Sequence, residues 1–444
     1  MLKVDPGADR VWVANDRDTA SVKGADGEEC GNRRATRATY TTVFGEVELE
    51  RATYQRSGRG RVAVPLELRL GIVEGAYTPR VARILTKAVA LMPEAEAEDL
   101  LEEVGVAKVS KSTLHRVPRA IASRYESRRE IIETALRARD PIPRHTATIQ
   151  IGLDGVMVPQ DGEDARARGR KTDDPEPPRH EQRYGPTGIE PPASTDGTSG
   201  RAWHEAAVGT VAFFDAEGNR LKTTYLARMP EANKATLTAG LEAELQAIVK
   251  ERPDVNICFA SDGAAPQWTA LEAMRSRLPT SMTGHQMMLV DAFHVAEYVQ
   301  LAANAIAGEQ SSDAKILAAT WRAIIREEKG GVARVLRAMR ARRRKPLTKA
   351  KRNDITRAIA YIRNQHALGR MDYPDALARH YPIGTGVTEA AAKTVVATRM
   401  KRAGARFSQH GGQTIMLFRA AVLSHRFDAL HDELHATYTS SVAA

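Results

Sequence analysis

The chain has 444 residues, with 65 Lys and Arg against 55 Asp and Glu, which gives a formal net charge of +10. This length allows two to four domains with a sizeable core, and the basic balance favours a polyanionic partner, of which nucleic acid is the commonest. The two cysteines exclude a disulfide framework and a cysteine-based zinc site, and no apolar run approaches the roughly 18 residues of a membrane span. With no apolar segment of a signal peptide near the charged N-terminus, we expect a cytoplasmic protein without membrane contact.

The first 140 residues change from irregular to alternating and then to helical patterning. Residues 1–37 are polar and aperiodic, which predicts a disordered tail. Residues 38–70 alternate apolar and polar side chains around Gly45, which predicts a β-hairpin segment. Residues 71–140 carry helical periodicity and predict a helical DNA-binding domain.

Within this helical domain a glycine turn separates two predicted helices, and Ser110 is placed as the N-cap of the second one. The pattern is that of a helix-turn-helix, whose second helix would enter a major groove. An ordinary helical hairpin gives the same pattern, so both interpretations stay open. The polar residues assigned to DNA contact on this helix are Lys111, Ser112, His115 and Arg116.

Residues 145–294 predict an α/β core. Three consecutive strands are followed by a helix, a strand, a helix and a last strand, which matches the order of a ribonuclease-H-like sheet. A polar segment without apolar periodicity, residues 161–202, interrupts this order and is expected to be a mobile loop.

Three carboxylates stand out because they occupy three separate elements. Asp154 lies inside an apolar strand, Asp262 ends a second strand, and Glu389 follows a glycine turn and opens a helix. Hard oxygen ligands from separate rigid elements are what a two-metal phosphoryl-transfer site needs. Each residue also has a plainer interpretation: a strand-edge Asp, a Ser-Asp-Gly turn, and an ion pair of Glu389 with Lys393.

A further pair follows the last predicted strand of the core. Asp291 could be a helix N-cap and His294 a packing residue of the first helical turn. The alternative is that both orient a ligand or contact the scissile phosphate. Their position at the same sheet edge as the other acids makes them candidate catalytic residues.

The remaining chain is helical and basic. Residues 295–380 predict an all-α insertion, and between Arg334 and Arg352 it holds ten Lys or Arg and no acid. Such a run is usually a solvated face, but uncompensated like charges favour a phosphate backbone. Residues 381–444 are expected to complete the core with C-terminal helices. The candidate phosphate contacts are Arg342, Arg343, Arg344 and Lys345 in the insertion, and Lys393, Arg399, Lys401, Arg402 and Arg406 on the last helix.

The order Asp-Gly, Ser-Asp-Gly-Ala, Asp-x-x-His and Gly-x-Gly-x-x-Glu-x-x-x-Lys, followed by Arg-Met-Lys, resembles DDE transposases of bacterial insertion sequences. The group it resembles is the ISKra type, related to the Mutator superfamily. The resemblance runs from Thr39 to Phe427 and is most specific at 384–401. Phe407 departs from it, because a Trp is expected there, and residues 54–61 lack the cysteine-paired segment of many relatives.

The resemblance implies a ribonuclease-H-like core with an all-α insertion before the last acid. It implies that Asp154, Asp262 and Glu389 bind two Mg²⁺ or Mn²⁺ ions, with Asp291 and His294 in support. The expected activity is strand cleavage at the terminal inverted repeats of an insertion sequence and transfer of the 3′-OH to double-stranded target DNA. The expected assembly is at least a homodimer, associated with the bacterial nucleoid.

Two rival functions remain at this point. A decayed or domesticated transposase would bind DNA without cutting it. A ribonuclease-H-like nuclease or resolvase would cut without joining.

Overall fold

The computed structural model describes residues 21–23, 29–55, 62–105, 109–160, 202–263 and 265–440. The chain forms two compact units, which are described separately. The terminal unit comprises Met1–Asp140, Pro159–Ala202 and Gly404–Ala444; the sheet unit comprises Pro141–Val158 and Trp203–Ala403. All but the last residue of the predicted mobile loop, most of the predicted disordered tail and most of the segment at 54–61 lie outside the described residues.

The terminal unit contains the predicted hairpin, which is longer than expected. It consists of β3 (Asn32–Thr42) and β4 (Gly45–Gln55), with β5 (Val62–Ala63) beside β4. Gly45 takes a φ of 110° at the turn, a value that favours glycine. The prediction that residues 32–37 are disordered is wrong, because these polar residues pair along their whole length with β4.

Six further helices of the terminal unit share one apolar core. They are α2 (Pro79–Leu91), α3 (Glu94–Glu103), α4 (Lys111–Ser127), α5 (Arg129–Arg139), α16 (Gln409–Leu423) and α17 (Phe427–Ser440). The structure corrects the prediction for the C-terminal helices after residue 404. Ile415 and Phe418 of α16 and Leu430 of α17 are buried with the apolar stripes of α2 and α4, so these helices belong to the terminal unit.

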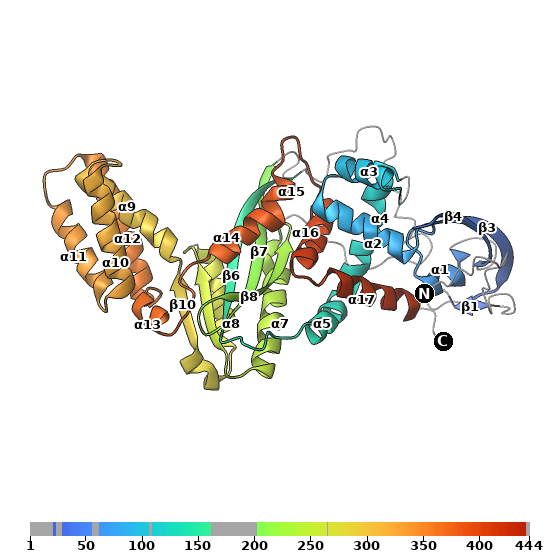
Figure 1. The fold of residues 1–444 in the computed structure, drawn as a ribbon, viewed down its shortest axis with the longest axis horizontal. Coiled ribbons are helices and arrows are strands. Elements are labelled where there is room, and N and C mark those ends of the chain that lie inside the picture. Colours follow the sequence, from blue (N-terminus) through green and yellow to red (C-terminus); the bar gives the residue numbers. More distant parts are fainter. Residues whose placement is uncertain are drawn as a thin grey trace. The chain divides into compact units, whose positions relative to one another are not determined.

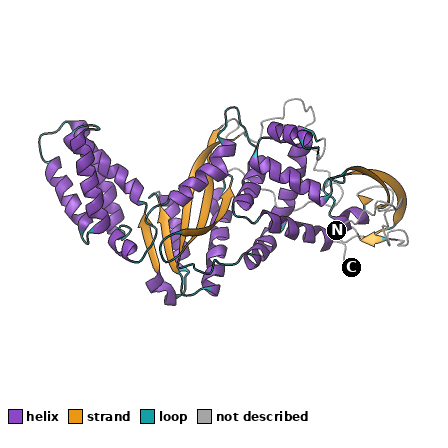
Figure 2. Ribbon diagram, in the orientation of Figure 1, coloured by secondary structure: helices purple, strands orange, loops and turns teal. Residues whose placement is uncertain are grey.

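The sheet unit is built on a mixed five-stranded sheet, which confirms the predicted α/β class (Figure 2). The strands lie in the order β10-β9-β6-β7-β8, with β9 parallel to both β10 and β6, and β7 antiparallel to β8. Their bounds are β6 (Thr148–Gln160), β7 (Ala202–Phe214), β8 (Arg220–Arg228), β9 (Asn256–Ser261) and β10 (Gln286–Val290).

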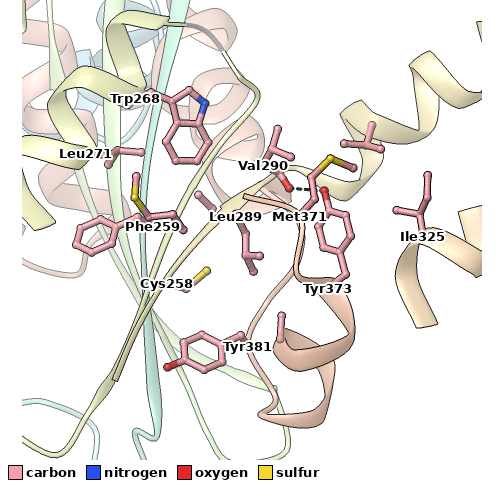
Figure 3. Close-up of a cluster of buried hydrophobic side chains, with 14 of the residues drawn as sticks. Cys258, Phe259, Trp268, Leu271, Leu289, Val290, Ile325, Met371, Tyr373 and Tyr381 are labelled. Carbon is pink, nitrogen blue, oxygen red and sulfur yellow. Dashed lines mark hydrogen bonds between the residues drawn. The ribbon is translucent and has the colours of Figure 1, made fainter. Parts of the chain in front are cut away.

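Helices α7 (Ala235–Glu251) and α8 (Ala265–Ser276) contribute their apolar stripes to the core of this sheet. Figure 3 shows Trp268 and Leu271 of α8 near Phe259 and Leu289 of the strands. The Tyr373 hydroxyl in the same cluster donates to the Val290 carbonyl over 2.8 Å. The apolar core therefore runs without a break from the sheet into the helices that follow β10.

Residues 292–378 contain only helices as regular elements, as the periodicity of the insertion predicts (Figure 1). They are α9 (Ala292–Ala307), α10 (Ser312–Glu327), α11 (Gly331–Arg343), α12 (Lys349–Ala367) and α13 (Tyr373–Ala378). In the described part of the chain, no helix combines the length and apolarity that crossing a membrane requires.

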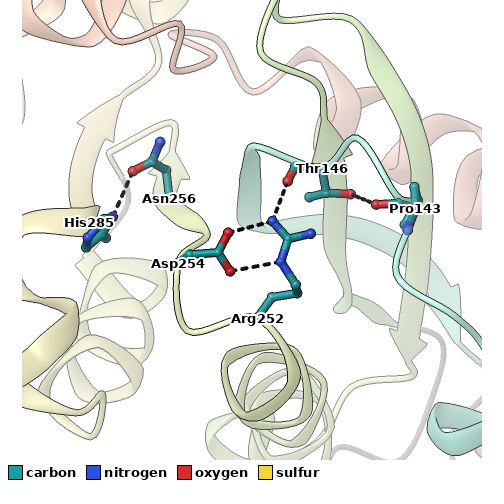
Figure 4. Close-up of polar contacts among 6 residues, drawn as sticks. All are labelled: Pro143, Thr146, Arg252, Asp254, Asn256 and His285. Atoms are coloured by element: carbon teal, nitrogen blue, oxygen red, sulfur yellow. Dashed lines mark hydrogen bonds and ion pairs between the residues drawn. The ribbon is translucent and has the colours of Figure 1, made fainter.

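A polar network ties together the starts of β6 and β9 (Figure 4). The Arg252 guanidinium donates to both carboxylate oxygens of Asp254 over 2.8 and 2.7 Å and to the Thr146 carbonyl over 3.1 Å. These bonds hold the pKa of Asp254 at about 2. The network fixes which residues of the two strands lie side by side, and this register determines the geometry at their other ends.

Candidate active site

The parallel register brings three aspartates to one level of the sheet. Gly152 of β6 pairs with Ala260 of β9, so continuing the register by two residues sets Asp154 opposite Asp262. Ser261 pairs with Val290 of β10, so the next residue along each strand sets Asp262 beside Asp291. The carboxyl ends of parallel strands are where α/β sheets bind ligands, so three acids at this level form a candidate site.

Alternation along the strands then decides which helix faces these acids. A Cβ on Gly209 of β7 would lie 2.5 Å from Leu241, so this side of the sheet faces α7. The next residue, Thr210, points to the other side, where its hydroxyl bonds the Thr388 hydroxyl of α14 (Gly386–Ala391) over 2.7 Å. A Cβ on Gly152 would overlap that same Thr388 hydroxyl, so Gly152 faces α14 too, and so does Asp154 two residues on.

One hydroxyl links the helix to the strand ends. The Thr385 hydroxyl lies 2.8 Å from Oδ2 of Asp291 and 3.0 Å from Oε1 of Glu389. The other oxygen of Asp291 accepts the Phe293 backbone N–H over 2.9 Å, so the N-cap interpretation of Asp291 is confirmed. Asp291 is only 1 % exposed, yet its carboxylate contacts the Thr385 hydroxyl, which also contacts Glu389. Its capping role and its place among the acids are thus compatible.

Burial and neighbouring carboxylates shift the pKa values of two of these acids. Burial and the nearby carboxylates of Asp291 and Asp154 raise the pKa of Glu389. Burial, with a smaller contribution from the Asp262 carboxylate, raises the pKa of Asp154, although the Gly155 N–H bonded to it over 2.7 Å opposes that shift. Burial and the neighbouring carboxylates therefore disfavour the ionised forms of Asp154 and Glu389.

These residues offer only carboxylate and hydroxyl oxygens, the donors that Mg²⁺ and Mn²⁺ prefer. Among the described residues, no three Asp, Glu, His or Cys side chains stand close enough together to form a ready-made metal-binding group. A divalent cation nonetheless fits the donor set, because it would favour the ionised forms of Asp154 and Glu389, which burial and the neighbouring carboxylates disfavour.

His294 lies one helical turn after Asp291 and is half-buried. Its Nδ1 is 3.2 Å from Glu297, and its ring meets the edges of Tyr298 and Tyr361. The Tyr361 hydroxyl donates to the Asp262 carbonyl over 2.8 Å. The packing interpretation of His294 thus agrees with its contacts, and Tyr361 is the residue through which it adjoins the acids.

The cationic residues near the last acid are placed differently from one another. Lys393 is exposed in a π-helical turn at Ala392–Ala397, an irregularity that is frequent at functional sites. Arg399 is only 3 % exposed, so the prediction that it contacts phosphate does not agree with its burial. Lys401 and Arg402 are exposed, but they follow the end of α15 (Thr398–Met400) instead of lying on a helix. Arg406 is exposed and belongs to the terminal unit.

In the terminal unit, the predicted recognition helix exists as α4, and two of its basic residues lie near acids. Ser110 caps it by accepting the Thr113 N–H, as predicted. Arg116 pairs with the buried carboxylate of Glu74 over 3.2 Å, and Lys111 lies 3.8 Å from Glu98 of α3. Burial and the neighbouring Arg119 lower the pKa of His115, so this imidazole is mostly neutral at pH 7. Of the four predicted contact residues, Lys111, Ser112 and His115 are exposed, and Arg116 is half-buried.

The basic run of the insertion is more accessible. Arg344 and Lys345 are exposed just after the end of α11. Arg342 lies over the Trp321 ring at 5.4 Å, and Arg343 donates to the Thr356 hydroxyl over 3.3 Å. Arg344 and Lys345 are therefore exposed, whereas Arg342 and Arg343 pack partly on the neighbouring helices.

Sequence reasoning did not single out Thr385, Glu205 or Lys234. Thr385 lies in the Gly-Thr-Gly turn before Glu389, so its position in the sequence could have indicated that it lies near this acid. Glu205 and Lys234 lie near Asp154 only in the folded chain, and no spacing in the sequence indicates it.

No known protein-family model matches this sequence, nor does any curated protein.

Proposed function

We propose that this protein is a DDE-type DNA transposase that cuts and joins DNA at the carboxylates of the sheet unit. The observation that carries the proposal is the convergence of Asp154, Asp262, Asp291 and Glu389, where burial, together with the neighbouring carboxylates, raises the pKa of Asp154 and Glu389. Perturbed carboxylates gathered at strand ends are typical of sites that bind cations and transfer phosphoryl groups.

The sheet order supports a ribonuclease-H-like core. Numbered along the chain from β6, the strands lie in the order 5-4-1-2-3, with an antiparallel hairpin followed by parallel additions. This arrangement agrees with the three strands, helix, strand, helix and strand that the sequence predicts. The helical insertion between Asp291 and Glu389 also agrees with the resemblance.

In this proposal Asp154, Asp262 and Glu389 hold two Mg²⁺ or Mn²⁺ ions, and Asp291 supports Glu389 through Thr385. The bound ions would supply charge neutralisation and an activated oxygen nucleophile. The Thr385 hydroxyl bridges two carboxylates and so fixes how far apart they stand. Tyr361, from α12 of the insertion, fixes the Asp262 backbone by donating a hydrogen bond to its carbonyl. No covalent enzyme–DNA bond is needed, so no Ser or Tyr nucleophile is assigned.

The proposed partner is double-stranded DNA, both the terminal inverted repeats and the target. The exposed basic residues after α11 and after α15 supply the phosphate-binding surface of the sheet unit: Arg344, Lys345, Lys401 and Arg402. Synapsis of two ends in the bacterial nucleoid would involve at least two copies of the chain.

The test is a cleavage and strand-transfer assay on supercoiled plasmid that carries the DNA flanking the gene, with Mg²⁺ and with Glu389→Gln beside the wild type. Cleavage and joining by the wild type alone establish the transposase. Cleavage without joined products identifies a nuclease, and binding without cleavage by either protein identifies a decayed, DNA-binding descendant.

A further inference from the structure

The segment that leads from the insertion into α14 has no regular structure and is held by one side chain of β6. Residues 382–385 belong to no helix or strand. The side-chain NH2 of Gln150 donates to the Pro382 carbonyl over 3.3 Å and to the Gly384 carbonyl over 3.0 Å. Gln150 is only 1 % exposed, and two carbonyl acceptors on one side of its amide require the NH2 group there. The irregular segment is therefore tied to the sheet through a buried amide.

The carbonyl between these two bonds to a different element. The Ile383 carbonyl accepts the Ala292 N–H at the start of α9 over 3.0 Å. Gly384 has no room for a side chain, because a Cβ there would lie 3.0 Å from the Phe293 ring. The segment is thus held between β6 and the start of α9, and its course is fixed as far as Thr385.

Fixing this segment also fixes the acid that follows it. The Thr385 carbonyl accepts the N–H groups of Thr388 and Glu389 over 2.8 and 3.0 Å, which begins α14. The Thr385 hydroxyl contacts the carboxylates of Asp291 and Glu389. Glu389 therefore takes its position from Thr385, whose neighbour in the chain, Gly384, is bonded to Gln150.

One face of β6 carries three residues that act on this arrangement. Side chains alternate along a strand, so Gln150, Gly152 and Asp154 all point to the side of the sheet on which α14 lies. Gln150 holds the segment before α14, Gly152 leaves room for Thr388 of α14, and Asp154 is the first acid. A single strand therefore determines how the first and the last acid stand relative to each other.

We infer that Gln150 is a positioning residue of the proposed site: by holding residues 382–384 on β6, it sets where Glu389 stands relative to Asp154. The inference rests on the proposed function, because two carboxylates bind a common metal centre only at the spacing that its oxygen ligands require. Gln150 is not itself a ligand. Residues that orient metal ligands from behind typically change metal affinity or activity by about 10–100-fold when they are replaced.

Hydrogen exchange and a Mg²⁺ titration of thermal unfolding test the two parts of this inference. The variants are Gln150→Met, which keeps the length of the side chain without a donor, and Gln150→Glu, whose neutral form keeps one O–H for two carbonyls. Cys258→Ala is the matched control. Cys258 pairs with Gln150 in the register of β6 and β9, and its thiol is only a weak donor to the same Pro382 carbonyl, at 3.5 Å.

Without metal, we expect the amides of Ala292, Thr388 and Glu389 to exchange faster in Gln150→Met than in the wild type and in Cys258→Ala. The Mg²⁺ concentration that gives half of the rise in melting temperature should be about 10–100-fold higher in Gln150→Met. It should rise less in Gln150→Glu and stay unchanged in Cys258→Ala. DNA affinity without divalent ions should be the same in all four proteins, because Gln150 is buried.

Unchanged exchange at the three amides in Gln150→Met would show that this side chain does not hold the segment, and it would overturn the inference independently of the protein's activity. Faster exchange with an unchanged Mg²⁺ midpoint would show a bond that stabilises only the fold, which overturns the inference and leaves the transposase standing. A wild type whose melting temperature does not respond to Mg²⁺ removes the proposed metal site and the inference with it. If Gln150→Met does not fold, the same two readouts in Gln150→Glu decide between these outcomes.

Discussion

The carboxylates of the sheet unit and the basic residues of α4 handle charge in opposite ways. At the sheet edge, Asp154 and Glu389 lie among other acids, and burial together with that crowding raises the pKa of both. On α4, Arg116 pairs with the buried carboxylate of Glu74, so its charge is compensated within the protein, whereas Lys111 lies 3.8 Å from Glu98 and is exposed.

This difference distinguishes residues whose charges need a bound counter-ion from residues whose charges stabilise the fold. Crowded like charges are unfavourable until a counter-ion arrives, whereas paired charges already have their counter-ion. Arg116 of the predicted helix-turn-helix therefore stabilises the terminal unit itself, while DNA contact by the exposed residues of α4 stays a prediction.

The largest expected effect is on chemistry. Asp154→Ala or Asp262→Ala should reduce DNA cleavage by at least about 10³-fold, because each removes a ligand of the reacting centre. DNA affinity should stay within about threefold of the wild type, since neither acid donates to phosphate. Single-turnover cleavage and a binding titration in Ca²⁺ measure the two quantities, and a variant that still cuts at the wild-type rate would remove these residues from the site.

Arg116→Ala should act on stability, lowering the free energy of unfolding by about 2 kcal/mol, because it removes the guanidinium partner of a buried carboxylate. Lys111→Ala is the matched control: its ion pair with Glu98 is longer and more exposed, so we expect a change below about 0.5 kcal/mol. Denaturant unfolding measures both. If both variants were as stable as the wild type and Arg116→Ala bound DNA much more weakly, the result would show that α4 contacts DNA.

Gly152→Ala should cost about 1–3 kcal/mol, because the new methyl group would overlap the Thr388 hydroxyl between β6 and α14. Gly386→Ala has open space around its Cβ and is the control on α14 itself. Thermal unfolding and cleavage are compared for both. If Gly152→Ala left both unchanged, α14 would not pack on the sheet as closely as these distances require.

The basic run of the insertion should show a smaller, salt-dependent effect. Replacing Arg344 and Lys345 with Ala should weaken DNA binding about tenfold at low salt and lower the salt slope by about 0.9 for each phosphate that is no longer neutralised. Lys315→Ala on the exposed side of α10 is the control. An unchanged slope would mean that these residues form only a solvated face.

Much of this architecture was predictable because apolar periodicity is local information. The strand around Asp154 is buried on both faces, as Ile151, Leu153 and Val156 suggested, and Ser110 caps α4 as its position indicated. Partners that meet only through tertiary packing were not predictable. No local pattern distinguishes the buried Arg399 from the exposed Lys401, or reveals that Glu74 neutralises Arg116. The role of Thr385 likewise follows from a helix that must first dock on the sheet.

The most direct test of the central claim is the effect of Mg²⁺ on thermal unfolding of the wild type and Asp154→Asn at constant ionic strength. A raised carboxyl pKa in the folded state means that stability is lost as the pH rises through that pKa, so at pH 7.5 without metal the variant should be more stable, by about 0.5–2 kcal/mol. Mg²⁺ should then raise the melting temperature of the wild type and leave that of the variant nearly unchanged. Equal shifts in both proteins, or no shift in either, would contradict the claim that these carboxylates await a divalent cation.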